Sequence, residues 1–134
     1  SQYNFEEMKA LIDEAHDRGR IVAAHAHGLQ GIKRAIKAGV DSIEHGSFID
    51  DEAIQLAKQH GTYLVMDLYV SDFILSEGEK AGILPESLAK EKKVGLLQRQ
   101  NFQKAVKAGV AYFGLSGHLF RFHPARRFGV IRPA

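Results

Sequence analysis

The chain has 134 residues, which is enough for one domain with its own hydrophobic core. Its net charge is only +2, and Lys and Arg are mixed with Asp and Glu, which argues against a nucleic-acid partner. The absence of cysteine excludes disulfides and thiolate metal sites. No apolar run approaches the ~20 residues of a membrane helix, and no secretory signal pattern opens the chain. The sequence therefore predicts a cytoplasmic protein with no membrane partner.

The first half of the chain alternates predicted helices and strands. The capping-box spacing of Asn4 and Glu7 predicts a helix that ends near Gly19. The elements that follow are a strand over 20–26, a helix over 28–37, a strand over 40–45, a helix from Asp50 or Asp51 to about 59, and a strand over 62–66. This order predicts βαβ units and a parallel sheet.

The second half is less regular. Residues 67–83 mix apolar and acidic side chains with two glycines, and predict a long loop. Pro85 opens a long predicted helix that runs to about Lys107. The segment AIKAGV at 35–40 returns as AVKAGV at 105–110, so the same helix end and strand start predict a fourth strand up to residue 115.

Three of the seven histidines lie within IVAAHAHGLQGIKRAIKAGVDSIEHG. His25 and His27 share one strand face, and His45 ends the next strand. Neighbouring strand ends lie ~5 Å apart, so His25 and His45 can converge at the carboxyl edge, where parallel α/β sheets bind ligands. Imidazole is a common zinc ligand, which makes His25 and His45 candidate metal ligands. His27, where the strand ends, is a candidate substrate-binding residue. The alternative is that each histidine is a hydrogen-bonded polar group at a strand end.

Tyr69 and Asp72 lie in the predicted loop after the third strand. Tyr69 is a further candidate substrate-binding residue, and the alternative is an ordinary solvated loop. His16 and His60 are predicted to be surface residues at helix ends.

The segment HAHG, followed by GI..AI.AGVDSIEHG and a DDEAI helix, resembles the amidohydrolase superfamily, in its imidazolonepropionase-like and Xaa-Pro dipeptidase-like branch. The resemblance runs from about Phe5 to Met66 and resumes at 101–114. It implies a TIM barrel with one or two divalent metals, such as zinc, at its carboxyl end. Residues 1–114 would then be a partial barrel, strands five to eight with their helices. The resemblance implies His25 and His45 as metal ligands, and strand alternation should turn Glu44 away from its neighbour His45.

The resemblance also implies a chemistry. In the family, metal-activated water hydrolyses an amide or another C–N bond of a small-molecule or peptide substrate, of the dipeptide or cyclic amide type. An aspartate after strand eight binds metal and handles the proton. Here FGLSGH stands in place of the family's FGTDAG, so Ser116 occupies the aspartate position. Serine cannot replace a carboxylate in this role, and no catalytic residue is assigned.

A complete barrel of this kind takes ~250 residues. The family's strand-one HxH motif and strand-four lysine are absent from the sequence, so we expect the isolated chain to be weak or inactive. Unpaired barrel edges predict self-association. The alternative function is a small α/β metal-binding or scaffold module without catalysis.

Residues 115–134 form a tail that departs from the family. HPARRF can be encoded so that a one-base shift reads PHGD, and the family often carries Pro-His-Gly shortly after GTDAG. The tail is hypothesised to be out of frame from near Leu115, with divergence or truncation as the alternatives. Its clustered arginines are the one feature that favours a nucleic-acid partner, and they lack a recognised fold for it.

Overall fold

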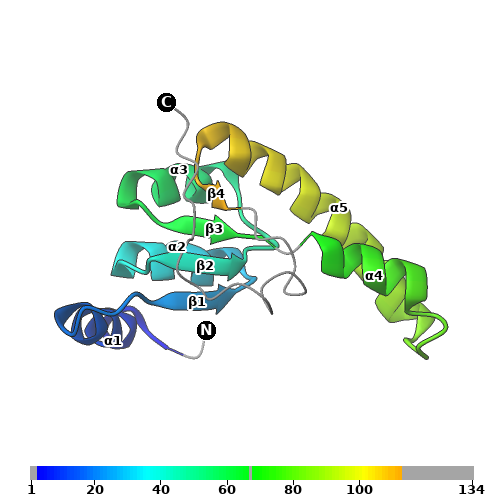
Figure 1. Cartoon of the computed structure of the whole chain (residues 1–134), viewed down its shortest axis with the longest axis horizontal. Helices are drawn as coiled ribbons and strands as arrows, with labels where there is room; N and C mark the ends of the chain where they lie inside the picture. The colour runs from blue at the N-terminus through cyan, green and yellow to red at the C-terminus, as the bar shows by residue number, and fades with distance from the viewer. Residues whose placement is uncertain (1–2, 67, 113–134) are drawn as a thin grey trace, which may run out of the picture.

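The computed structural model describes residues 3–66 and 68–112. Its elements are α1 (Phe5–Asp17), β1 (Ala23–Ala26), α2 (Leu29–Ala38), β2 (Ser42–His45), α3 (Asp51–His60), β3 (Tyr63–Val65), α4 (Tyr69–Glu77), α5 (Pro85–Ala108) and β4 (Ala111–Tyr112). The four strands form one parallel sheet in the order β1-β2-β3-β4 (Figure 1). The predicted parallel α/β fold is confirmed. The last predicted residues of the fourth strand lie outside the described residues.

The core lies between the sheet and the helices α2 and α3. Ile43 of β2 and Leu64 of β3 are fully buried, and they meet Ile32 and Ile36 of α2 in the same cluster. Alternate strand residues point the other way, so that Ala23, His25 and Tyr63 are exposed on the opposite face. Both faces of a parallel sheet are usually covered. Among the described residues, helices cover one face of this sheet, and no helix or strand covers the face that carries His25, which we call the open face.

The helix ends follow the local chemistry of the sequence. Asn4 Oδ1 accepts the Glu7 amide at 2.9 Å, and Glu7 Oε2 accepts the Asn4 amide at 2.8 Å, which confirms the capping box. Asp50 caps α3 by accepting the Ala53 amide at 2.8 Å. These caps set where α1 and α3 begin, and the cap at Asp50 lies just after the strand that ends in His45.

The predicted long loop over 67–83 is wrong, because it contains the helix α4. Its side chains are poor helix formers, but tertiary packing stabilises it. Ser71 of α4 is buried, and its hydroxyl donates to Glu91 Oε1 of α5 at 2.6 Å. A β-carbon on Gly95 would lie only 3.0 Å from Ser71 Cβ, so the glycine allows the two helices to approach closely. The partners that stabilise α4 lie on a different helix, out of reach of a local pattern.

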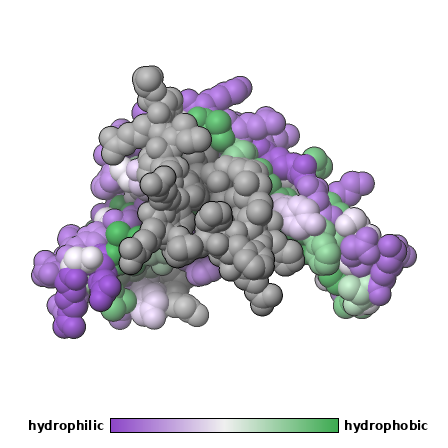
Figure 2. All heavy atoms as spheres, viewed as in Figure 1, coloured by the Kyte–Doolittle hydropathy of each residue, from purple (hydrophilic) through white to green (hydrophobic). Residues whose placement is uncertain are grey.

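The helices α4 and α5 form an arm that projects beyond the sheet (Figure 1). Figure 2 shows hydrophobic surface along this arm. The large apolar side chains exposed on it are Tyr69, Val70, Phe73, Leu75, Leu84, Leu96, Leu97 and Val106. Within the described ranges, no helix has the length and apolar character needed to cross a membrane.

Candidate functional site

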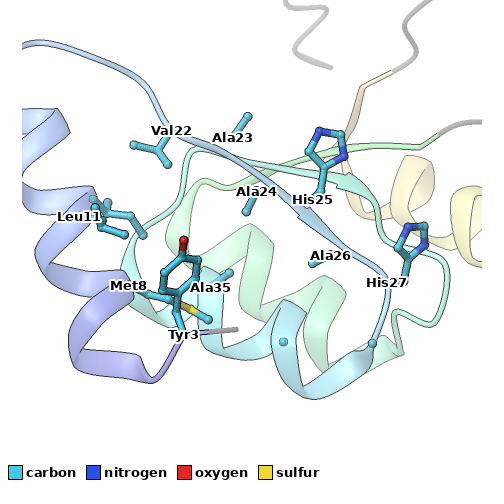
Figure 3. A pocket seen from close by; sticks show the side chains of 13 residues that line it. Tyr3, Met8, Leu11, Val22, Ala23, Ala24, His25, Ala26, His27 and Ala35 are labelled. Atoms are coloured by element: carbon cyan, nitrogen blue, oxygen red, sulfur yellow. The ribbon is translucent and has the colours of Figure 1, made fainter. Parts of the chain in front are cut away.

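His25, His27 and His45 form a cluster of contacting rings at the carboxyl ends of β1 and β2. His25 Nδ1 lies 2.8 Å from His45 Nε2, so one nitrogen donates a hydrogen bond and the other accepts it. The His27 ring stacks on the His45 ring with centroids 4.8 Å apart and planes 8° from parallel. Figure 3 shows His25 and His27 projecting from the same side of β1, away from α1 and α2. The convergence expected for His25 and His45 is thus present.

The backbone of His45 explains how its ring reaches His25. Its φ is +71°, in the left-handed region that residues other than glycine rarely adopt. The strand register pairs His45 with Ala26, whose side chain lies on the helix side, so a regular strand would direct His45 away from His25. The left-handed conformation turns the imidazole toward the open face instead. Gly46 also has a positive φ, +59°, and together the two residues end the strand sharply.

Glu44 lies on the open face with His25, and the His45 ring reaches His25 on that face, so the expectation that Glu44 points away from His45 is wrong. The register pairs Glu44 with His25, and Ser42 Oγ donates to Glu44 Oε1 at 2.8 Å along the same face. The alternation argument failed because it assumed a regular strand through His45. A carboxylate therefore shares the open face of the sheet with the candidate ligand His25.

A cavity of about 480 Å³ lies between the cluster and the α4–α5 arm. His27, His45 and Ser47 line it from the strand ends, and α4 and α5 contribute polar groups that include Ser71, Lys90, Glu91 and Gln98. Ser47 is buried, and its hydroxyl lies 2.9 Å from His27 Nδ1. The cavity thus places hydroxyl, amide and charged groups beside two of the three imidazoles.

Tyr69 does not line either cavity at the cluster. It begins α4 with 62% of its side chain exposed, while Val70, Ser71 and Ile74 line the 480 Å³ cavity. Asp72 faces away from the cavity as well, since it pairs with Arg99 on the surface. Of the candidate substrate-binding residues, the structure therefore brings His27 and not Tyr69 to the cluster.

A larger groove of about 730 Å³ runs along the free edge of β1, between this strand and α1 (Figure 3). Its walls include the apolar side chains of Met8, Leu11, Ile12 and Val22, and His25 and His27 stand at its end. The groove is a gap beside an edge strand, and the polar groups of the site gather in the smaller cavity.

An ion-pair network stabilises the segment that follows the cluster. Lys33 of α2 donates to Glu52 Oε2 at 2.6 Å and to Asp50 Oδ2 at 2.9 Å, and these bonds raise the pKa of Lys33. Burial alone would raise the pKa of Asp50, but the Ala53 amide and Lys33 outweigh it and hold that pKa below its usual range. These ion pairs connect the start of α3 to α2, a few residues after His45 in the chain.

The residues of the cluster fit a divalent metal in part. Two imidazole ligands of a tetrahedral zinc ion lie about 3.3 Å apart, given Zn–N distances of about 2.0–2.1 Å. The facing nitrogens of His25 and His45 lie 2.8 Å apart, which is shorter than this separation and fits a hydrogen bond between the two rings. In residues 3–66 and 68–112, no group of three or more His, Asp or Glu side chains is arranged to hold a metal ion. The cluster offers two ligands of the right chemistry, and a closed site needs more.

The sequence analysis missed the polar residues of the smaller cavity, among them Ser47 and Gln98. Ser47 is the second residue after the end of β2, and its place next to Gly46 was the available signal. Gln98 lies on α5, where its Nε2 donates to the backbone oxygen of His45 at 3.3 Å. No local pattern connects residues so far apart in the sequence. Ser116, the residue at the family's aspartate position, lies outside the described residues.

Comparison with known proteins identifies the family of the chain. The chain belongs to the amidohydrolase family, whose sequence model matches residues 1–116. Ochratoxinase of Aspergillus niger is 40% identical over 111 residues, which are 82% of this chain and 23% of that protein. The crystal structure of A. niger ochratoxinase superposes with a TM-score of 0.75 and 38% identity over 84% of this chain and 26% of that one.

Two further solved structures are similar to this chain. A Xaa-Pro dipeptidase with methionine bound in its active site has a TM-score of 0.71 and 43% identity over 84% of this chain and 28% of that one. A prolidase complexed with N-methylphosphonate-L-proline has a TM-score of 0.73 and 36% identity over the same shares. The chain thus spans about a quarter of the length of its relatives, and its small parallel sheet with helices is consistent with part of an amidohydrolase barrel.

Proposed function

We propose that this chain supplies two metal ligands, His25 and His45, to a metal-dependent hydrolase of amide or other C–N bonds. The observation that carries the proposal is the 2.8 Å approach of His25 Nδ1 and His45 Nε2 at the carboxyl end of a parallel sheet. Histidine ligation favours zinc. Membership of the amidohydrolase family and hydrolase relatives support the reaction type.

The proposed assignment makes β1, β2, β3 and β4 the strands five to eight of a larger barrel, with residues 1–114 as its C-terminal part. A divalent metal bound there would lower the pKa of a water and polarise the scissile carbonyl. His25 and His45 would hold the metal, and His27 would contact substrate from the cavity side. Tyr69 would reach substrate only if α4 moves, because its ring does not line the cavity.

The proposed substrate is a small molecule or short peptide with a hydrolysable amide, of the dipeptide or cyclic amide type. The solved relatives support this choice, since one is a Xaa-Pro dipeptidase and another is a prolidase with a proline-containing ligand. We propose that the isolated chain is weak or inactive, because two histidines fall short of the three or four ligands of a catalytic site. Dipeptide hydrolysis by the chain that disappears in His45→Ala would contradict this.

Zinc titration of the purified chain tests the proposed ligands. We expect one zinc per chain in the wild type, and loss of that binding in both His25→Ala and His45→Ala. His60→Ala is the matched control, because His60 is exposed at the end of α3 and remote from the cluster. Equal binding by all four proteins would assign the zinc to other residues. Wild-type binding no tighter than that of a single surface histidine would contradict the proposed site.

The proposal for residues 115–134 rests on the amino-acid sequence alone, because these residues lie outside the part of the chain that the structure describes. We propose that this segment is read out of frame from near Leu115. Sequencing the coding DNA tests it directly: a shifted frame should encode GTDAG followed by PHG, and its absence would refute the shift.

A further inference from the structure

His45 adopts a backbone conformation that its own sequence does not favour. A positive φ is unfavourable for a residue with a β-carbon, and such conformations persist where surrounding groups enforce them. The conformation matters because it turns the imidazole to the same face as His25. The residues that enforce it therefore also determine whether the two imidazole nitrogens meet.

Gln98 of α5 reaches the backbone of His45 from another element. Its Nε2 lies 3.3 Å from the carbonyl oxygen of His45, and its side chain is only 5% exposed. This distance is at the long end for a hydrogen bond, and the amide is the donor that α5 places against this carbonyl. The amide also lines the 480 Å³ cavity together with His27 and His45.

The position of Gln98 is fixed by the packing of α5. Gly95 lies one turn before it and lets α5 approach Ser71 of α4, whose hydroxyl bonds Glu91. At the other end of α5, Lys104 pairs with Asp51 of α3 at 2.8 Å. The buried face of the helix consists of Gly95, Gln98, Asn101 and Ala105. Gln98 is thus one of two amide side chains that α5 directs into the protein.

We propose that Gln98 is a positioning residue for His45: its side-chain amide holds the carbonyl of His45 and so keeps the imidazole turned toward His25. The expected effect of Gln98 on metal binding rests on the proposed function, in which His25 and His45 are metal ligands. The geometric part stands without a metal, because it concerns the contact of two imidazoles in the chain itself.

The test compares the wild type with Gln98→Met, which keeps the length of the side chain and removes the donor. Long-range ¹H–¹⁵N NMR spectra of the imidazole groups report the His25–His45 hydrogen bond without any metal. We expect the signals of His25 and His45 to change in Gln98→Met, while those of His16 and His60 stay in place. Unchanged signals for His25 and His45 in the folded variant would overturn the proposal.

Zinc titration of the same proteins gives the second measurement. Loss of a group that orients a ligand commonly lowers metal affinity about 10–100-fold, and we expect at least about a tenfold loss in Gln98→Met. Wild-type protein that binds no zinc would refute the proposed function, whereas the NMR comparison would still decide the role of Gln98. Zinc affinity equal to that of the wild type would overturn the role of Gln98 and leave the metal ligands intact.

Gln98→Glu is the second variant, because it keeps the shape and an ionised carboxylate cannot donate. It covers the case in which methionine disturbs the fold, as judged by circular dichroism. The proposal expects Gln98→Glu to perturb His25 and His45 in the same way. If both variants unfold, Gln98 acts on the fold as a whole, and its specific role toward His45 is rejected.

Discussion

Asp41 is a single carboxylate with partners from two other parts of the chain. Its Oδ2 accepts the Val22 amide at 2.7 Å and lies 2.8 Å from His16 Nε2 of α1. Burial alone would raise the pKa of Asp41, but the bonds from His16 and Val22 outweigh it and lower that pKa below its ordinary value of 3.8. His16, predicted as a plain surface residue, therefore joins α1 to the start of the sheet.

Asp41→Asn should lower the free energy of unfolding at pH 7 by about 1 kcal/mol at most, since the side chains of Asp41 and His16 are both more than a third exposed. A lowered folded-state pKa stabilises the protein above the unfolded-state pKa, and this stabilisation is lost as the pH falls through the folded-state value. Urea unfolding at pH 7 and below pH 4 measures the difference between the two proteins. We expect it to shrink in acid.

Asp13→Asn is the matched control for this pH dependence. Asp13 forms an exposed i,i+4 pair with Lys9 on the surface of α1, at 2.7 Å, so its loss should change stability little at either pH. A difference between Asp41→Asn and the wild type that is the same in acid and at pH 7 would contradict the role given to the carboxylate.

Single residues of the site were predictable where the chain is regular. His25 and His27 share a face because strand alternation holds through β1, and the sequence predicted it. Glu44 was misplaced because alternation breaks at His45, and a positive φ at histidine has no sequence signal. Gln98 was missed because its contact with His45 depends on the path of α5.

At the scale of helices, close packing of α4 on α5 depends on Gly95. Gly31 of α2 offers a matched comparison, since a β-carbon there would meet nothing within 4 Å. Gly31→Ala should stabilise the protein by about 0.5–1 kcal/mol through helix propensity. Gly95→Ala gains the same stabilisation from helix propensity, but its β-carbon would lie 3.0 Å from Ser71 Cβ. This crowding costs about 1–3 kcal/mol of stability.

Chemical unfolding of the two variants gives the difference directly. We expect Gly95→Ala to be less stable than Gly31→Ala by about 1 kcal/mol or more. An equal increase in the free energy of unfolding in both variants would contradict this prediction. It would show that α4 shifts to accommodate the new β-carbon and that α4 and α5 are loosely packed.

The elements with strong local signals were predicted, and α4 was not. Asn4, Asp50 and Pro85 fix helix starts through chemistry within three or four residues. The residues of α4 have no such start signal: Leu68 at its N-cap makes no side-chain bond to the helix. The helix exists because α5 packs against it, and that information lies about 20 residues further along the chain.

At the scale of the whole molecule, β1 is an edge strand beside an apolar groove. Leu11 of α1 lines this groove with 58% of its side chain exposed, and Ile21 before β1 is 86% exposed. Unpaired strand edges and exposed apolar side chains favour association. We propose that copies of the chain associate through this edge.

Leu11→Glu should raise the Kd of self-association about tenfold or more, because it places a charge where apolar surface would be buried. Leu96→Glu is the control, since Leu96 is also 58% exposed but lies on the α4–α5 arm. Sedimentation velocity over a range of concentrations measures both. A larger effect of Leu96→Glu would move the interface to the arm, and a monomeric wild type would refute self-association.

The parallel sheet as a whole was predictable from repeated strand–helix spacing. Its extent was not, because the sequence cannot show which neighbour covers the outer edge of β1 or the open face. The matched part of this chain covers 23% of ochratoxinase and 28% of the Xaa-Pro dipeptidase, and the additional length of these relatives was indicated in the sequence only through the family resemblance.

The order of the sheet also has a consequence for folding. Strands β1, β2 and β3 pair with partners about 20 residues away, whereas Leu64 of β3 pairs with Ala111 of β4 across the whole α4–α5 arm. Short loops close at the lowest entropic cost, so we expect the first three strands to form early and α5 to dock late. His25 and His45 then belong to the early part and Gln98 to the late part. The two imidazoles would come near each other first, and the docking of α5 would complete their geometry.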